Sequence, residues 1–417
     1  MWAPSDQNGA FTEYGITPGF SAWSFTDSKR PLSLSFLGNP PSAFAGLGAS
    51  ARSLIYADGA LLSALIGNNN TSASPRWSAV SPQEIARIDV LYGPFSAAYP
   101  GNSIGAVVNI TTRLPDEFEA TVTAGTSVQT YDLYGRRDMF AAYQAGVTIG
   151  DRFGRLALFA SYDHVTSRGQ PLGYATAITA PAGTSGSVAD VNRLGQSIRV
   201  LGATGIESQG QDRLKLKAAF DLSDTIRLTY VGGLFLNRTD STSETFLTTT
   251  ATGLPNYPLA LSSGIYRTDQ RHWSHALSAT GGSKRFDWQV IGTRYTVDRD
   301  EQRIATTALP AATSGGAGTI TRLNGTGWTT LDAKGVWRSD DAGTNALSFG
   351  AHWDQFRIAS NRYATTDWIT GPPGALNLQS LGKTRTAAVW AQDAFKITPT
   401  VTLNLGGRYE WWRASDG

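Results

Sequence analysis

The feature that most constrains the fold is an alternation of apolar and polar residues, one by one, in segments of about ten residues through the C-terminal two-thirds of the chain. In residues 401–411, one set of alternate positions reads Val, Leu, Leu, Gly, Tyr, Trp and the other reads Thr, Asn, Gly, Arg, Glu. Successive side chains of a β-strand point to opposite faces, so this segment predicts a strand with one apolar and one polar face. Residues 143–149, 214–222 and 347–354 divide in the same way.

Eleven such segments follow residue 118, and the connections between them alternate in length. The segments are 119–127, 139–149, 155–166, 211–222, 225–237, 269–281, 284–298, 326–338, 345–358, 383–396 and 399–413. The short connections are 150–154, 223–224, 282–283, 339–344 and 397–398, and the long ones are 128–138, 167–210, 238–268, 299–325 and 359–382. A soluble sandwich has no reason to place every long connection at one end. A transmembrane β-barrel does, because its periplasmic turns are tight and its extracellular loops are long.

Soluble sandwiches, lectins and propellers also contain alternating strands, and they are the alternative to a membrane barrel. Two details favour the membrane. Each segment has at least the nine to eleven residues that a tilted strand needs to cross a bilayer. Aromatic residues also gather toward segment ends, as interfacial girdles require; they are Phe286, Trp288, Phe395, Tyr409, Trp411 and Trp412.

Composition excludes several classes of protein. The net charge of +2 rules out a polyanion binder that works by its overall field, so no nucleic-acid partner is expected. No apolar run reaches 18 residues, so no transmembrane helix is expected. The chain has 0 cysteines, which excludes disulfides and thiolate chemistry. Residues 1–20 do not resemble a signal peptide, so an exported protein would have its true N-terminus further upstream.

The first 118 residues have a different pattern. Residues 52–62 read as strand, Asp58-Gly59 turn and strand, because both turn positions tolerate a positive φ. Ser81-Pro82-Gln83-Glu84 reads as the start of a short helix, with Glu84 closing a capping box. Strands at 88–91 and 106–110 complete a small α+β domain.

The order of these pieces closely resembles the plug signature of TonB-dependent outer-membrane receptors. The match runs through residues 85–113, the hairpin at 54–62 is similar to the segment that precedes it in that family, and 388–409 is similar to a mid-barrel strand pair. The signature positions are Asp58, Gly59, Arg87, Asp89, Gly93, Pro94, Gly101, Gly105, Asn109 and Arg113.

The chain departs from the family pattern in four places. No Arg-Gly pair precedes the Asp58-Gly59 turn, and Tyr92 stands where the family often has a basic residue. Nothing in residues 1–43 resembles the energy-coupling peptide, and the chain ends in Ser415-Asp416-Gly417 rather than in an aromatic residue.

The resemblance implies a plug domain at residues 1–118, incomplete at its N-terminus, and the first half of a barrel at 119–417, incomplete at its C-terminus. Outer-membrane transporters have 22 strands around a plugged lumen, so about 11 strands make a partial antiparallel transmembrane barrel. Its open edges would leave backbone groups unpaired in lipid. We therefore expect a fragment of a receptor that does not transport by itself.

For the intact protein, the resemblance implies active import of a scarce, bulky nutrient across the bacterial outer membrane. The expected cargo is a ferric siderophore, with cobalamin, haem or a glycan as alternatives. The implied partners are a TonB-type energy-coupling protein, outer-membrane lipid and a small-molecule ligand such as a metal chelate. A passive porin or adhesin barrel and a secreted carbohydrate-active β-protein are the two alternatives from other classes.

Candidate functional residues fall into two groups. Plug loops expected to face the ligand carry Asn68, Asn69, Asn70, Arg76, Trp77 and Asn102. Lys215 and Lys217 are expected to point into the lumen and meet plug acids such as Asp89 or Glu84. We find no catalytic constellation, so no enzyme activity, cofactor or metal site is expected. His272 and His275 lie three apart on a strand and face opposite sides, which makes them a poor metal pair.

Overall fold

The computed structural model describes residues 11–14, 20–27, 30–37, 53–62, 79–91, 96–100, 106–339, 344–398 and 400–416. In 11–37, and at Ser53 and Ala106, the description covers the backbone only. Strands β1 (Phe11–Tyr14), β2 (Phe20–Asp27) and β3 (Arg30–Leu37) form a small antiparallel sheet of their own.

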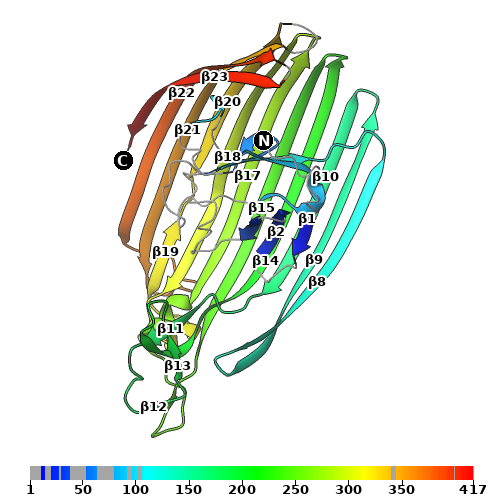
Figure 1. Ribbon diagram of the computed structural model, residues 1–417. Coiled ribbons are helices and arrows are strands. Elements are labelled where there is room, and N and C mark those ends of the chain that lie inside the picture. The colour runs from blue at the N-terminus through cyan, green and yellow to red at the C-terminus, as the bar shows by residue number, and fades with distance from the viewer. Residues whose placement is uncertain are drawn as a thin grey trace.

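A large antiparallel sheet dominates the described part of the chain and curves around the N-terminal region (Figure 1). Eleven strands follow one another along its path from β8 to β23. They are β8 (Glu119–Leu133), β9 (Arg136–Phe153), β10 (Leu156–Arg168), β14 (Ser197–Ser223), β15 (Ile226–Thr245), β17 (Tyr266–Gly282), β18 (Phe286–Ala305), β19 (Gly318–Arg322), β21 (Asn345–Thr365), β22 (Leu376–Thr398) and β23 (Val401–Ser415). Strand β20 (Gly327–Arg338) continues the course of β19, since both pair with β18 and β21.

The two faces of this sheet differ as the alternation predicts. On β14, the apolar side chains Leu214 and Leu216 are 43% and 60% exposed on the convex face. The intervening Lys215 is 5% exposed and points to the concave face. The sheet is thus a wall with an apolar outside and a polar inside, which is the architecture of a transmembrane β-barrel.

The strands are longer than the segments expected from the sequence, and one predicted loop is wrong. Residues 128–138 were expected to form a long connection, but β8 and β9 pair through this range and turn tightly at Tyr134 and Gly135, whose φ angles are 57° and 74°. Backbone pairing continues beyond the span that must face lipid, and there the side chains need no apolar alternation.

The long connections contain short elements and a small core of their own. The elements are β11 (Gly173–Ala177), β12 (Thr184–Ser185), β13 (Val188–Val191), β16 (Thr248–Thr249), η4 (Leu259–Gly264) and η5 (Ala311–Ser314). The indole Nε1 of Trp368 donates a hydrogen bond of 2.8 Å to the carbonyl oxygen of Ala312. Both residues are buried with Leu201, Leu247 and Leu261, so four of these connections pack into one cluster at the long-loop end.

The plug is a four-stranded mixed sheet in the order β5-β4-β7-β6. Its elements are β4 (Ser53–Ala57), β5 (Ala60–Leu61), the single 3₁₀ turn η3 (Pro82–Glu84), β6 (Ile85–Leu91) and β7 (Ala106–Thr112). Plug residues Leu54, Ile55 and Val107 share one buried cluster with wall residues Trp328 and Phe356. The plug is therefore seated on the concave face of the wall (Figure 1).

Among the described residues, no helix has the length and apolar character needed to cross a bilayer.

Candidate functional site

Glu84 is the central residue of the interface between plug and wall. Its Oε1 atom accepts hydrogen bonds from the backbone N–H of Ser81 at 2.6 Å and from Lys215 Nζ at 3.0 Å. Its Oε2 atom accepts from the hydroxyl of Ser161 on β10 at 2.8 Å. The Glu84 carboxylate therefore closes the capping box of η3 and also binds Ser161 and Lys215 of the wall. The local turn thus fixes the position of the group that the wall binds.

Asp58 makes the second ionic contact. Lys217 Nζ lies 3.0 Å from Asp58 Oδ1 and 2.9 Å from the carbonyl oxygen of Thr112. Burial by itself raises the pKa of Asp58, but Lys215, Lys217 and the hydrogen bonds of Thr112 outweigh it, so the pKa is lowered from its usual value. The carboxylate is charged at neutral pH and bound to the wall.

A third polar contact lies beside these two. Asp163 on β10 is 1% exposed and accepts hydrogen bonds from Gln83 Nε2 of the plug at 2.5 Å and from Gln144 Nε2 of β9 at 2.8 Å. Arg213 of β14 pairs with the same carboxylate. Gln83 and Glu84, adjacent in sequence, are thus both anchored to β10.

The far side of the plug contacts the opposite end of the sheet. Gln392 Oε1 on β22 accepts hydrogen bonds from Ser96 Oγ at 2.8 Å and from the N–H of Ala97 at 3.2 Å. Arg408 on β23 donates to the carbonyl oxygen of Ala98 at 3.2 Å. The plug therefore bridges the concavity from β9 and β10 to β22 and β23.

Other residues singled out from the sequence have separate places. Asp89 does not meet the lysines; it pairs with Arg87 at 2.9 Å on an exposed part of β6. Asn109 donates to Tyr99 Oη at 3.2 Å, and Arg113 pairs with Glu119 at the start of β8. Gly93, Pro94, Gly101, Gly105, Asn68, Asn69, Asn70, Arg76, Trp77 and Asn102 lie outside the described residues.

Sequence reasoning missed Asp163, Trp328 and Gln392 as contacts of the plug. Their inward position follows from the alternation of their strands, and that is the one signal the sequence carries. Which inward residues touch the plug depends on how deep the plug sits, and this depth is set by contacts between distant segments.

Above the lysines, toward the long loops, the wall presents amides and hydroxyls. Asn237 Nδ2 donates to Gln270 Oε1 at 3.0 Å, and Gln270 Nε2 donates to Asp300 Oδ2 at 2.9 Å. Among the described residues, the buried atoms in this area without a hydrogen-bond partner include Gln211 Nε2, Asn237 Oδ1 and Thr268 Oγ1. A buried polar atom without a partner costs about 1–3 kcal/mol, so these atoms lower the stability of this area.

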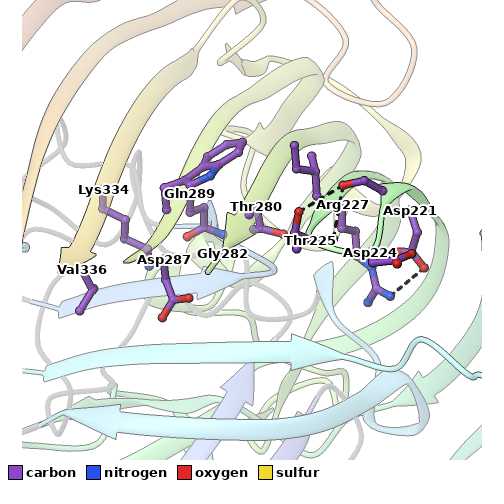
Figure 2. Close-up of a pocket in the computed structure, with 14 residues that line it drawn as sticks. Asp221, Asp224, Thr225, Arg227, Thr280, Gly282, Asp287, Gln289, Lys334 and Val336 are labelled. Carbon is purple, nitrogen blue, oxygen red and sulfur yellow. Dashed lines mark hydrogen bonds and ion pairs between the residues drawn. The ribbon is translucent and has the colours of Figure 1, made fainter. Parts of the chain in front are cut away.

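A cleft of about 520 Å³ opens at the short-turn end of the wall. Asp221, Arg227, Asp287 and Lys334 line it, together with the turn at 223–225 (Figure 2). Asp221 pairs with Arg227 at 2.5 Å, so acids and bases are mixed here and no single sign of charge dominates. Within the described ranges, no group of three or more His, Asp or Glu side chains is arranged to hold a metal ion.

A curved wall of antiparallel strands, apolar outside, with a small mixed domain seated inside it defines the class of outer-membrane β-barrel receptors with a plug. Family comparison agrees: residues 16–107 match the TonB-dependent receptor plug domain, and residues 215–417 match the TonB-dependent receptor-like β-barrel. The chain belongs to the family of TonB-dependent receptors, whose members are outer-membrane proteins. These family matches are to transport receptors rather than to enzymes.

Solved structures of this family share the fold. The ferric citrate transporter FecA superimposes with a TM-score of 0.60 at 14% identity, covering 98% of this chain and 55% of that one. The ferripyoverdine receptor of Pseudomonas aeruginosa gives 0.57 at 14% identity, with coverages of 95% and 48%. The ferric enterobactin receptor PfeA of the same organism gives 0.57 at 15% identity, with coverages of 95% and 54%. The chain thus spans about half the length of these receptors.

One curated relative matches a short stretch. The ferric enterobactin receptor PirA of Pseudomonas aeruginosa is 38% identical over 63 residues, which cover 15% of this chain and 8% of that protein.

Proposed function

We propose that the receptor containing this sequence imports a ferric chelate of the siderophore class across the outer membrane, driven by a TonB-type partner that pulls on the plug. The observation that carries the proposal is the set of buried ionic contacts between plug and wall. Lys215 with Glu84 and Lys217 with Asp58 hold the plug by bonds that break and re-form without loss of covalent structure. A plug that must yield to a pulling force and then reseat requires contacts of this reversible kind.

The cargo is proposed from two sources. Similar receptors are named for ferric enterobactin, ferripyoverdine and ferric citrate, all of which are iron chelates. In this chain, the inward side chains of the wall toward the long loops are amides and hydroxyls such as Gln211, Asn237 and Thr268, whose chemistry matches a ligand rich in amide and hydroxyl groups. Asn68, Asn69, Asn70, Arg76, Trp77 and Asn102 remain the proposed ligand-facing residues of the plug loops.

A passive porin and a secreted carbohydrate-active protein would each differ from this structure in a specific feature. A passive porin has no need for the buried Glu84–Lys215 pair that seats a plug in its lumen. Glu84 and Asp163 do not form the solvent-accessible pair of carboxylates that a secreted carbohydrate-active protein needs, because they are 2% and 1% exposed and are engaged by wall and plug. Both alternatives are tested by the experiment below.

The test measures uptake of radioactive ferric siderophores by cells whose only relevant outer-membrane receptor carries this sequence. Uptake is compared in cells with and without a functional TonB-type complex, and binding at 4 °C is measured in both. We expect binding in both strains and accumulation only in the energised one. Accumulation that is equal in the two strains indicates a porin, and absence of binding to ferric chelates combined with hydrolysis of glycans indicates the enzyme; either result refutes the proposal.

A further inference from the structure

Four long connections of the wall are joined to one another in the order of the sequence. They are called the first (169–196), second (246–265), third (306–317) and fourth (366–375) connection. The first contains β11, β12 and β13, which gather at the lower end of the wall in Figure 1. Each connection makes hydrogen bonds to the next, so the four form a continuous series at the long-loop end.

Backbone pairing joins the first connection to the second. Strand β12 of the first pairs with β16 of the second in an antiparallel ladder. Next to this ladder, the N–H of Thr250 donates to the carbonyl oxygen of Gly183 at 2.9 Å. A Cβ atom at Gly186, whose φ is +94°, would overlap the carbonyl oxygen of Phe246. The two backbones are therefore in direct contact.

The second connection is joined to the third mainly by apolar packing. A hydrogen bond runs from the N–H of Leu309 to Ser262 Oγ at 3.4 Å. Where β18 ends, the N–H of Ala305 donates to the carbonyl oxygen of Ile265 at 3.1 Å. Ile265, Ala305 and Leu309 are buried in the same cluster. The stability of this junction therefore depends on the cluster as a whole.

Trp368 joins the fourth connection to the third and to the wall. Its backbone N–H donates to the carbonyl oxygen of Gly316 at 2.8 Å, and its indole Nε1 donates to that of Ala312 at the same distance. The guanidinium carbon of Arg267 on β17 lies 5.5 Å from the centroid of the indole ring, in a cation–π contact. Arg303 on β18 donates to the carbonyl oxygen of Trp368 at 3.4 Å. This one residue therefore contacts the third connection and two strands.

The four connections share a single apolar core. Among the described residues, every buried apolar side chain of the connections belongs to the same cluster. The first connection contributes Ala175, the second Leu247, Leu261 and Ile265, the third Leu309 and Ala312, and the fourth Trp368. Ordering a connection costs backbone entropy, and a ladder as short as that of β12 and β16 is not stable alone. Each connection therefore needs its neighbours in order to fold.

We propose that the four connections form one cooperative cap, which is folded before any cargo binds and depends on Trp368 for its closure. A cooperative unit opens and closes as a whole, so its amides share one opening free energy. Cargo that contacts the cap then meets a surface that is already ordered, and a shift of one connection is transmitted to the other three. The inference concerns the cap alone and holds for any cargo.

The experiment uses the outer-membrane protein that carries this sequence, purified in a mild detergent without cargo. Hydrogen exchange is measured by mass spectrometry for the wild type and for Trp368→Ala. The diagnostic amide is that of Thr250, because it is bonded to the first connection and is two junctions away from the fourth. The matched control is Trp337→Ala, which removes an indole that is 43% exposed on the convex face of β20.

Exchange at the Thr250 amide is expected to rise about a hundredfold in Trp368→Ala, because loss of a buried tryptophan weakens the whole shared core. The protected amides of 306–317 and 366–375 are expected to change by a similar factor. Trp368→Phe keeps a ring but lacks the donor to Ala312, and is expected to raise exchange about tenfold in the same pattern. Trp337→Ala is expected to stay within about twofold of the wild type.

Three outcomes overturn the proposal. Unchanged exchange at Thr250 while the fourth connection exchanges faster would mean that the connections open separately. Exchange at the unprotected rate throughout the four connections of the wild type would mean that the cap is not folded before cargo binds. Equally faster exchange in 211–237 of β14 and β15 would mean that the wall has lost stability and that the cap is not a separate unit.

Discussion

The indole Nε1 of Trp328 on β20 donates a hydrogen bond of 2.8 Å to the carbonyl oxygen of Leu61 on β5, which joins wall and plug across 267 positions of sequence. The Trp328 ring is stacked on Tyr295 with 4.2 Å between centroids and 1° between planes. Phe356 lies 6.0 Å from the same ring. Three neighbouring strands thus supply aromatic rings against which the plug hairpin packs. The hydrogen bond from Trp328 to Leu61 fixes the hairpin in this position.

Replacing Trp328 by Phe keeps an aromatic ring but removes the donor to Leu61. The buried carbonyl oxygen then lacks a partner, which is expected to cost about 1–3 kcal/mol of plug stability. Trp328→Ala also removes the packing and is expected to cost about 3–5 kcal/mol. Hydrogen exchange at the amides of residues 54–61 measures the effect as faster exchange.

Trp337→Phe is the control, because Trp337 is on the same strand but is 43% exposed on the convex face. Its effect on exchange in the hairpin is expected to stay within about 0.5 kcal/mol. Equal effects at positions 328 and 337 contradict the role assigned to the Trp328–Leu61 bond.

Reversing the two wall lysines tests the ionic contacts of the plug. Lys215→Glu/Lys217→Glu places new negative charges beside Glu84 and Asp58, and breaking even one buried pair costs about 3–5 kcal/mol. The plug is expected to loosen, which raises the ion conductance of the receptor in planar bilayers. Lys334→Glu, in the open cleft at the short-turn end, is the control and is expected to leave conductance unchanged. A closed channel in the double variant refutes the prediction.

The sequence predicted the two faces of the wall because alternation with a period of two is a local property. It placed Lys215 and Lys217 on the concave face for the same reason. It did not single out the partner of each lysine: Lys215 meets Glu84, but Lys217 meets Asp58 and neither meets Asp89. That choice depends on the seating of the plug against a strand more than 130 positions away, which no local pattern encodes.

The alternation of apolar and polar residues also did not predict where the strands end. Residues 128–138 are rich in polar side chains and were expected to be a loop, yet β8 and β9 remain paired up to Leu133 and Arg136. Hydrogen bonding between backbones holds this hairpin together where neither face meets lipid. The domain boundary at residue 118 and the ligand-facing residues of the plug remain predictions.

The lowered pKa of Asp58 makes plug stability depend on pH. Since the folded-state pKa lies below the ordinary value of about 3.9, the stabilisation by Lys215 and Lys217 is present above about pH 4 and is lost as pH falls through the folded pKa. Asp58→Asn removes this dependence. Between pH 7 and 3, the stability of the wild-type plug is therefore expected to fall more steeply than that of the variant, as measured by hydrogen exchange of β4.

Asp89→Asn is the matched control for this pH series, because Asp89 lies on the exposed part of β6 and contacts Arg87 rather than the wall. It is expected to follow the wild-type curve. Parallel curves for the wild type and Asp58→Asn would show that the carboxylate does not contribute through its charge.

Gly59 tests how tightly the hairpin fits the wall. Its φ of +81° is costly for any other residue, and a Cβ atom there would overlap Ile291 Cδ1 on β18. Gly135, with φ +74° in the β8–β9 turn, has nothing within 4 Å of the same position. Gly135→Ala is therefore expected to cost only the backbone strain, about 1–2 kcal/mol. Gly59→Ala is expected to cost the same strain plus about 1–3 kcal/mol for overpacking.

The source of the additional cost is tested by a double-mutant cycle with Ile291→Val, which removes the Cδ1 atom that the new methyl group meets. Ile291→Val alone is expected to destabilise by about 0.5–1.5 kcal/mol, because Ile291 is 8% exposed and packs with Ala60. In combination with Gly59→Ala, it is expected to relieve most of the overpacking, so the two changes together cost less than their sum by about 1 kcal/mol or more. Denaturant unfolding of the plug measures each corner of the cycle. Additive costs would mean that the hairpin shifts away from β18 to accommodate the methyl group, and the close contact at Gly59 would then not constrain how the plug is seated.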